Sequence, residues 1–131
     1  MGLLDGKKGV ILGVANNKSI AWGIAEACNR EGAQLAFTYL NESIEKRVRP
    51  LAESLGQKVC VKCDASIDND FKTAFEEIGK EFGSIDFVVH SIAYAPGDDL
   101  HGRFNQVSRQ GFAVAMDISC LLYTSVFGRG I

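Results

Sequence analysis

The residues best suited to chemistry lie in one loop, which reads GVANNKSIAWG from Gly13 to Gly23. The loop stands between the apolar run GVIL and the amphipathic run IAEACNREG, where dinucleotide-binding folds hold a pyrophosphate against a helix N-terminus. Gly13 permits a tight turn, Ser19 can cap the helix or donate to a phosphate oxygen, and Gly23 would let the helix pack close to the sheet. No G-x-G-x-x-G can be written, so an ordinary strand-to-helix turn remains the alternative.

Two further groups have residue types that could bind a metal or react. Cys60 and Cys63 have C-x-x-C spacing, but they fall in an apolar strand pattern, where residues three apart point to opposite faces. No second pair completes a zinc set, so we predict free buried thiols, a reducing compartment and no metal site. His90 lies within another apolar run, and we interpret it as a buried core histidine.

The elements that must position these residues alternate along the chain. Four short apolar runs rich in Val, Ile and Phe read as strands buried on both faces of a parallel sheet. They are predicted at Gly9–Val14, Gln34–Tyr39, Lys58–Cys63 and Ile85–Ile92.

Helical patterns separate the strands, each with an apolar stripe at spacings of three and four. The stripes are Ile20, Ile24 and Ala27 with Cys28; Ile44, Val48, Leu51 and Leu55; and Phe71, Phe75, Ile78 and Phe82. A glycine follows each stripe, where a left-handed residue ends a helix at least cost: Gly32, Gly56 and Gly83. Asp68 and Asp70 suit a helix start, and Pro50 is expected to kink or divide the second helix.

This alternation predicts an α/β fold, a Rossmann-like doubly wound parallel sheet of about four strands in the order 3-2-1-4. The 131 residues are about one domain, with 47% hydrophobic residues to build a core. A net charge of −2 provides no basic field for nucleic acid, and no apolar run approaches the roughly 18 residues of a membrane span. We expect a cytoplasmic protein.

Several motifs together resemble one family. G-x5-S-x-A-x-G in the loop is followed in order by GAQLAFTYLNE, KRVRPLAE, CDAS, DFVVHSIAYAP and GRFNQVSRQGFAVAMDIS. These are similar to the bacterial NADH-dependent enoyl-(acyl carrier protein) reductases of the short-chain dehydrogenase/reductase superfamily. The resemblance covers residues 1 to about 119, the N-terminal, dinucleotide-binding part of a single domain in a family whose chains are about twice this length.

The resemblance implies a role for individual residues. Gly13, Ser19 and Ile20 would contact the pyrophosphate and nearby ribose of the cofactor. Asp64 and Ala65 would hold the adenine ring, although Asp64 is equally suited to cap a helix. Ser91 and Ile92 would line the nicotinamide side, and Ala95 the substrate end of the cleft, with Tyr94 close by.

The residues after the second strand bear on the choice of cofactor. Dinucleotide folds place an acid there for a ribose hydroxyl or an arginine for a 2′-phosphate. This chain has Leu40-Asn41-Glu42, where many members of the family have glutamine at the first position. Leu40 cannot form a hydrogen bond to ribose, and Glu42 could simply support the next helix. With no cation at 40–42, NADH is expected rather than NADPH.

By resemblance the reaction is reduction of a trans-2-enoyl thioester on acyl carrier protein, in fatty acid biosynthesis by a homotetramer. The family uses a Tyr-x6-Lys pair, and residues 1–131 contain none: glycine stands seven positions after Tyr123. We therefore assign no catalytic residue and predict no turnover by this chain. The segment CLLYTSVFGRGI, 120–131, is unlike the family and is interpreted as a non-native tail. The alternatives are another short-chain reductase acting on a carbonyl, or a non-catalytic dinucleotide-binding module.

Overall fold

The computed structural model describes residues 1–121. Contacts divide the chain into two compact units, Met1–Ser91 and the part from Ile92 onward. Most of the segment predicted to be a non-native tail, 122–131, lies outside the described residues, as does Tyr123. Among residues 1–121, no helix is long and apolar enough to cross a membrane.

The first unit is built on a four-stranded parallel sheet with the order β3-β2-β1-β4, as predicted. Its strands are β1 (Lys8–Leu12), β2 (Gln34–Tyr39), β3 (Val59–Lys62) and β4 (Phe87–His90). In the register, Val10 of β1 lies between Ala36 of β2 and Val88 of β4. The predicted bounds of β2 are confirmed, whereas the other three strands are shorter than expected.

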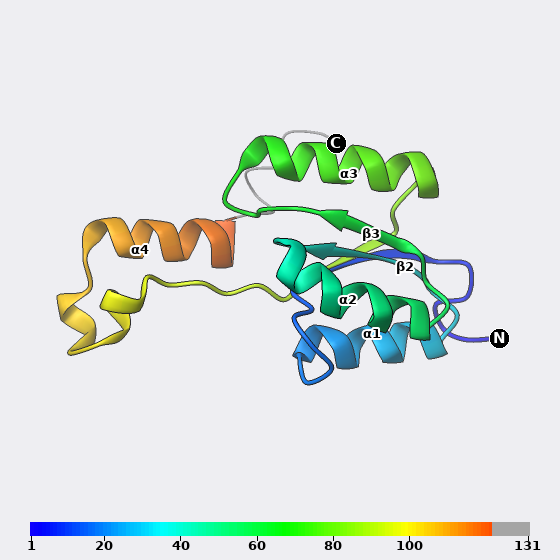
Figure 1. Cartoon of the computed structure of the whole chain (residues 1–131), viewed down its shortest axis with the longest axis horizontal. Coiled ribbons are helices and arrows are strands. Elements are labelled where there is room, and N and C mark those ends of the chain that lie inside the picture. Colours follow the sequence, from blue (N-terminus) through cyan, green and yellow to red (C-terminus); the bar gives the residue numbers. More distant parts are fainter. Residues whose placement is uncertain (122–131) are drawn as a thin grey trace. The chain divides into compact units, whose positions relative to one another are not determined.

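Three helices connect the strands: α1 (Ile20–Arg30), α2 (Glu42–Ser54) and α3 (Asp68–Phe82). Figure 1 shows α1 and α2 on one face of the sheet and α3 on the other, so the sheet is doubly wound. Pro50 lies inside α2 without dividing it. Gly32, Gly56 and Gly83 have the predicted left-handed φ angles of 91°, 76° and 75° after the three helices.

Packing confirms two of the predicted stripes and corrects the third. Phe71, Phe75, Ile78 and Phe82 are all buried, and Val48 is buried with Ile44, Leu51 and Leu55 packed around the same core. The stripe predicted for α1 is only partly right: Cys28 packs against the core, but Ile20 is 79% exposed. The buried residues of α1 are instead Ala21, Trp22 and Ala25, since two small alanines and one indole ring bring this helix against the sheet.

The strand ends also differ from the sequence pattern. Val14 is buried, but the ladder of β1 ends at Leu12 because Gly13, with a φ of 105°, turns the chain out of the extended conformation. Among the described residues β4 pairs only with β1, and all four of its residues are half-buried. The interpretation of His90 as a buried core histidine was therefore wrong: it is half-buried, because this strand lies at the edge of the sheet.

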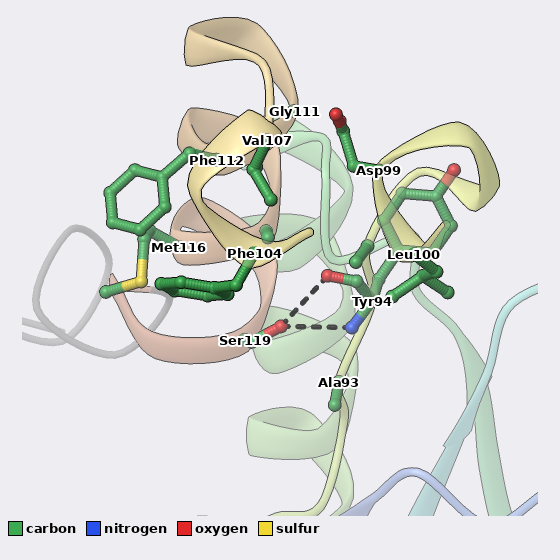
Figure 2. A pocket seen from close by; sticks show the side chains of 12 residues that line it. Ala93, Tyr94, Asp99, Leu100, Phe104, Val107, Gly111, Phe112, Met116 and Ser119 are labelled. Carbon is green, nitrogen blue, oxygen red and sulfur yellow. Dashed lines mark hydrogen bonds between the residues drawn. The ribbon is translucent and has the colours of Figure 1, made fainter. Parts of the chain in front are cut away.

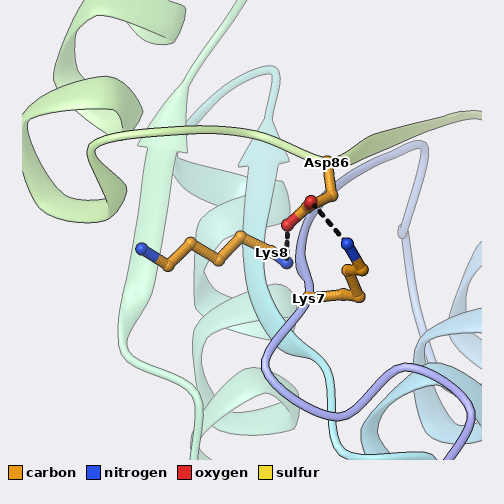
Figure 3. Close-up of polar contacts among 3 residues, drawn as sticks. All are labelled: Lys7, Lys8 and Asp86. Carbon is orange, nitrogen blue, oxygen red and sulfur yellow. Dashed lines mark hydrogen bonds and ion pairs between the residues drawn. The ribbon is translucent and has the colours of Figure 1, made fainter.

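A polar cluster joins the opposite, amino-terminal ends of β1 and β4 (Figure 3). The carboxylate of Asp86 accepts from the Nζ of Lys7 at 3.1 Å and from the backbone N–H of Lys8 at 2.8 Å. The Lys8 backbone hydrogen bond, assisted by Lys7, lowers the pKa of Asp86 below its ordinary value of 3.8. The Nζ of Lys8 also donates to the carbonyl of Phe82, at the end of α3. These bonds hold together the start of the central strand β1 and the start of the edge strand β4.

The described part of the second unit contains η1 (Gly97–Leu100), η2 (Phe104–Gln106), α4 (Arg109–Met116) and η3 (Asp117–Leu121). The last of these is a π-helical turn that continues directly from α4. Of residues 92–121, only Gly111 is buried.

Candidate cofactor-binding site

The candidate residues of the first unit gather at one edge of the sheet. Parallel strands bring their carboxyl ends together, and Gly13, Leu40 and Ser91 directly follow β1, β2 and β4. Asp64 comes two residues after β3, at the same edge. The order 3-2-1-4 reverses between β1 and β4, and such a switch point is where open α/β sheets bind ligands.

Gly13 and Ser91 approach each other closely at this switch point. Ser91 donates its backbone N–H to the carbonyl of Leu12 at 3.1 Å. A Cβ on Gly13 would overlap the carbonyl oxygen of Ser91, and the φ of Gly13 is one that other residues rarely adopt. Glycine is thus required for the turn, as the sequence predicted, and also for the close approach of two backbones.

Ser19 organises the loop, and the expected capping bond is not formed. It occupies the N-cap position of α1, yet its side chain makes no capping hydrogen bond to the helix. Its Oγ instead accepts from the backbone N–H groups of Ala15 at 3.0 Å and Asn16 at 3.1 Å. Both acceptor positions of the hydroxyl are then filled, so its hydrogen is free to bind a ligand, with no acceptor among residues 1–121.

The start of α1 provides two further donors. The backbone N–H groups of Ile20 and Ala21 have no acceptor among the described residues, as is usual in the first turn of a helix. Together with the Ser19 hydroxyl, they can receive an anion at the positive end of the helix dipole. Gly23 does not bring the helix close to the sheet, because it is exposed and a Cβ there would meet nothing within 4 Å.

The turn after β2 is held by polar side chains. Leu40 is 49% exposed, and the Oδ1 of Asn41 caps α2 by accepting from the N–H of Ile44 at 3.1 Å. One oxygen of Glu45 accepts from Arg49 Nε at 3.1 Å and from its Nη2 at 2.5 Å. This pairing lowers the pKa of Glu45.

The turn after β3 combines a polar loop with two free thiols, of which Cys63 is buried and Cys60 is half-buried. Asp64 Oδ1 accepts from the backbone N–H of Ser66 at 2.9 Å and from its hydroxyl at 2.6 Å, which shapes the entry to α3. Ala65, the second residue expected at adenine, is half-buried beside it. Burial raises the pKa of Cys63 to about 11 and also raises that of Cys60. Both cysteines are free, and residues 1–121 contain no cluster suited to a metal.

The second unit contains a pocket of about 520 Å³, which Figure 2 shows from close by. Ala95, expected at the substrate end, lines it together with Ala93 and Tyr94, and Ile92 lies half-buried just before them. The Oγ of Ser119 accepts from the backbone N–H of Tyr94 at 3.0 Å and donates to its carbonyl at 3.2 Å. The other lining residues are mostly apolar: Asp99, Leu100, Phe104, Val107, Gly111, Phe112, Ala115 and Met116.

The contact of Asp99 with Ser108 was not predicted from the sequence. Asp99 accepts from the backbone N–H of Ser108 at 2.9 Å and from its hydroxyl at 3.0 Å, and Ser108 Oγ in turn accepts from Gly111 at 2.9 Å. A Cβ on Gly111 would overlap the Asp99 carboxylate, so any larger residue there would displace the Asp99 side chain. The signal available was a serine three residues before a glycine at a helix start; nothing in the sequence identified Asp99 as its partner.

Comparisons with known proteins identify close relatives. The family model described as enoyl-(acyl carrier protein) reductase matches residues 13–128. The chain is 53% identical over 119 residues to the NADH enoyl-(acyl carrier protein) reductase of Aquifex aeolicus, covering 91% of this chain and 44% of the relative. With that of Escherichia coli it is 46% identical over 127 residues, covering 96% and 48%.

Solved structures agree with these relatives. A reductase from Anaplasma phagocytophilum in complex with NAD has a TM-score of 0.91 and 48% identity, covering 98% of this chain and 49% of that one. The Bacillus cereus enoyl-acyl carrier protein reductase with NADP⁺ and indole naphthyridinone has a TM-score of 0.90 and 45% identity, covering 96% and 50%. The chain thus spans about half the length of the relatives it matches.

Proposed function

The chain belongs to the enoyl-(acyl carrier protein) reductase family, and on that premise we propose that it forms the cofactor-binding part of an NADH-dependent reductase. The whole protein would reduce trans-2-enoyl-(acyl carrier protein) to the saturated acyl form in fatty acid biosynthesis. The observation that carries the proposal is the loop from Gly13 to Ser19, at the switch point of the sheet.

The residues present suit a dinucleotide. Gly13 allows the loop to turn away from β1 beside Ser91, and the free donors of Ser19, Ile20 and Ala21 suit an anion. Asp64 would accept from the exocyclic amine of adenine through oxygen lone pairs that Ser66 leaves unused. Ser91 and Ile92 would line the nicotinamide side, since they follow β4 directly.

When bound, NADH supplies the hydride of the reaction. The described residues would bind and orient the cofactor, and Ala95 would lie at the substrate end. Residues 1–131 contain no Tyr-x6-Lys pair, so turnover is not proposed for this chain. An NADH-oxidation assay with a crotonyl thioester should give the rate of the enzyme-free blank; a faster rate would contradict this expectation.

Titration of the purified protein with NADH, followed by nicotinamide fluorescence, tests the binding site. We expect Ser19→Ala to weaken NADH binding about tenfold or more, because a hydrogen bond to a charged group is lost and the loop loses its organising acceptor. Ser19→Thr keeps the hydroxyl and is the matched control, with an expected change of less than about threefold. Equal affinities for NADH in the wild type and in Ser19→Ala would contradict the proposal that this loop binds the cofactor.

Other parts of the proposal rest on the family resemblance. Acyl carrier protein as the carrier of the substrate, and a homotetrameric assembly, are carried over from it. A cytoplasmic location is supported by four cysteines that are all free, which suits a reducing compartment. That 120–131 form a non-native tail stays a prediction, which re-sequencing of the source DNA tests: an intact reading frame to a natural stop after Ile131 would refute it.

A further inference from the structure

Thr38 in β2 is the only polar residue that is buried among residues 1–121, with 4% of its surface exposed. Its hydroxyl forms no hydrogen bond with any of these residues. A buried hydroxyl without a partner has lost the hydrogen bonds that water would give it, and such groups are rare in folded proteins. The Thr38 hydroxyl therefore calls for a partner from outside the described residues.

The Thr38 side chain lies on the α3 face of the sheet. Phe37, the preceding residue of β2, packs in the core with α1 and α2 on the opposite face, and side chains alternate along a strand (Figure 1). In the register, Thr38 pairs with Val61 of β3, and Leu12 of β1 comes directly after the pair of Ile11 and Phe37. Leu12 and Val61 are buried and apolar, so neither side chain offers the hydroxyl an acceptor.

The hydroxyl of Thr38 reaches the molecular surface. Within residues 1–121, no fully enclosed polar side-chain atom lacks a hydrogen bond, so the unbonded hydroxyl belongs to the small exposed part of the residue. Thr38 is the second-last residue of β2, next to the carboxyl edge where Leu40 follows. Because β2 lies between β1 and β3, Thr38 is on the side of the switch point where Asp64 and Ala65 follow β3. This is the adenosine side of the proposed site.

We propose that the Thr38 hydroxyl donates a hydrogen bond to the adenosine half of NADH, to a ribose oxygen or a ring nitrogen of adenine. This inference rests on the proposed function, because it adds a contact to the same cofactor. The bound cofactor supplies the acceptor that the protein lacks, so only the free protein bears the cost of the unbonded hydroxyl. The contact is separate from Ser19, which lies in the loop before α1.

Thr38→Val distinguishes this role from a structural one. Both side chains are β-branched, so valine keeps the packing against Leu12 and Val61 and removes only the hydroxyl. If the hydroxyl serves the fold, the variant is less stable. If it serves the cofactor, the free protein is stabilised, because a buried unbonded polar group is gone, while NADH binding weakens. Effects of opposite sign therefore identify a ligand contact.

The test measures dissociation constants for NADH and ADP-ribose by calorimetry, together with the melting temperature of the free protein. ADP-ribose contains the adenosine half and lacks nicotinamide, so a contact to adenosine should affect both ligands equally. The variants are Thr38→Val, Thr38→Ser and Thr73→Val. Thr38→Ser keeps the hydroxyl. Thr73 is an exposed residue of α3, so Thr73→Val is the matched control for the same chemical change.

We expect Thr38→Val to bind NADH and ADP-ribose about three- to tenfold more weakly than the wild type, and to melt about 2–4 °C higher. Thr38→Ser should bind both ligands within about twofold of the wild type, although it should melt lower because it loses a buried methyl group. Thr73→Val should leave both affinities within about twofold of the wild type.

Unchanged affinities in Thr38→Val, with NADH bound by the wild type, would overturn this contact and leave the proposed function intact. The contact would also be overturned by a loss of affinity for NADH alone, since the acceptor would then not lie on adenosine. An equal loss in Thr38→Ser, or a lower melting temperature of Thr38→Val, would show that Thr38 serves packing instead. Failure of the wild type to bind either ligand would overturn the contact and the proposed function together.

Discussion

The two units of the chain differ in what holds their candidate residues in place. In the first unit the strands β1 and β2 supply fully buried side chains, including Ile11 and Phe37 with no exposed surface. In the described part of the second unit only a glycine is buried, while Leu100 is 70% exposed and Phe104 is 87% exposed. Its geometry depends on a few hydrogen bonds from Asp99, Ser108 and Ser119.

This difference shows two ways of positioning a site. At the sheet edge, Gly13 and Ser91 are placed by backbone hydrogen bonds and the packing of buried strands. Around the pocket of the second unit, the chain is placed by exposed side-chain hydrogen bonds, each worth about 1 kcal/mol. We expect the geometry of the first arrangement to stay the same when exposed side chains are substituted. The geometry of the second should change on single polar substitutions.

The largest expected contrast comes from one aromatic residue in each unit. Phe71→Ala removes a fully buried ring stacked on Phe75 at 4.7 Å, and should cost about 3–5 kcal/mol of unfolding free energy. Phe112→Ala removes a ring that is 54% exposed and should cost less than about 1 kcal/mol. Denaturant unfolding of both variants measures these changes in unfolding free energy. Similar losses of stability in the two variants would show that the second unit has a core of its own.

A smaller effect is expected at the two glycines of the 13–23 loop, which is proposed to bind the cofactor. Gly13→Ala forces a Cβ against Ser91 at a left-handed φ, and should cost about 1–3 kcal/mol and weaken NADH binding. Gly23→Ala is the control, because its Cβ would enter open space inside a helix; it should stabilise by about 0.5–1 kcal/mol. Thermal melts of the two variants should shift in opposite directions, and a loss in Gly23→Ala would mean that this glycine does serve packing.

In the second unit, Asp99→Ala should cost about 1 kcal/mol of local stability, because it removes the acceptor for Ser108. The adjacent Asp98 is exposed and forms no hydrogen bond with the described residues, so Asp98→Ala is a matched control. Hydrogen exchange of the amides from 97 to 111 should accelerate in the first variant only. Equal protection in both would show that the Asp99 contact does not hold this segment.

The smallest effect concerns Asp86, a polar contact at the surface of the first unit. Its pKa is lowered on folding, so its contribution is present above the ordinary value of 3.8 and is lost as the pH falls through the folded value. Asp86→Asn should therefore lower the melting temperature slightly at pH 7, and the two proteins should converge near pH 2. A constant difference across this range would exclude an ionic contribution.

Much of the first unit could be predicted from residue patterns. The stripes of α2 and α3 were readable because Val48, Phe71 and Ile78 repeat at helical spacing, and burial follows such spacing. The buried face of α1 could not be predicted, because alanine is only weakly hydrophobic and the positions of Ala21 and Ala25 therefore did not mark it, although both are fully buried. Ser19 was assigned to the right loop, but its bonding depends on how the chain turns back toward Ala15.

The sequence by itself determined the strand order, the position of the loop proposed to bind the cofactor, and the need for glycine at position 13. These follow from local periodicity and from the right-handed connection of parallel strands, which leave few alternatives. Only the tertiary structure decided which carboxylate after β2 is free, that Ser19 organises the loop without capping its helix, and that Asp99 meets Gly111. Such contacts join residues whose separation in sequence has no fixed period, so they depend on how the folded backbone brings them together.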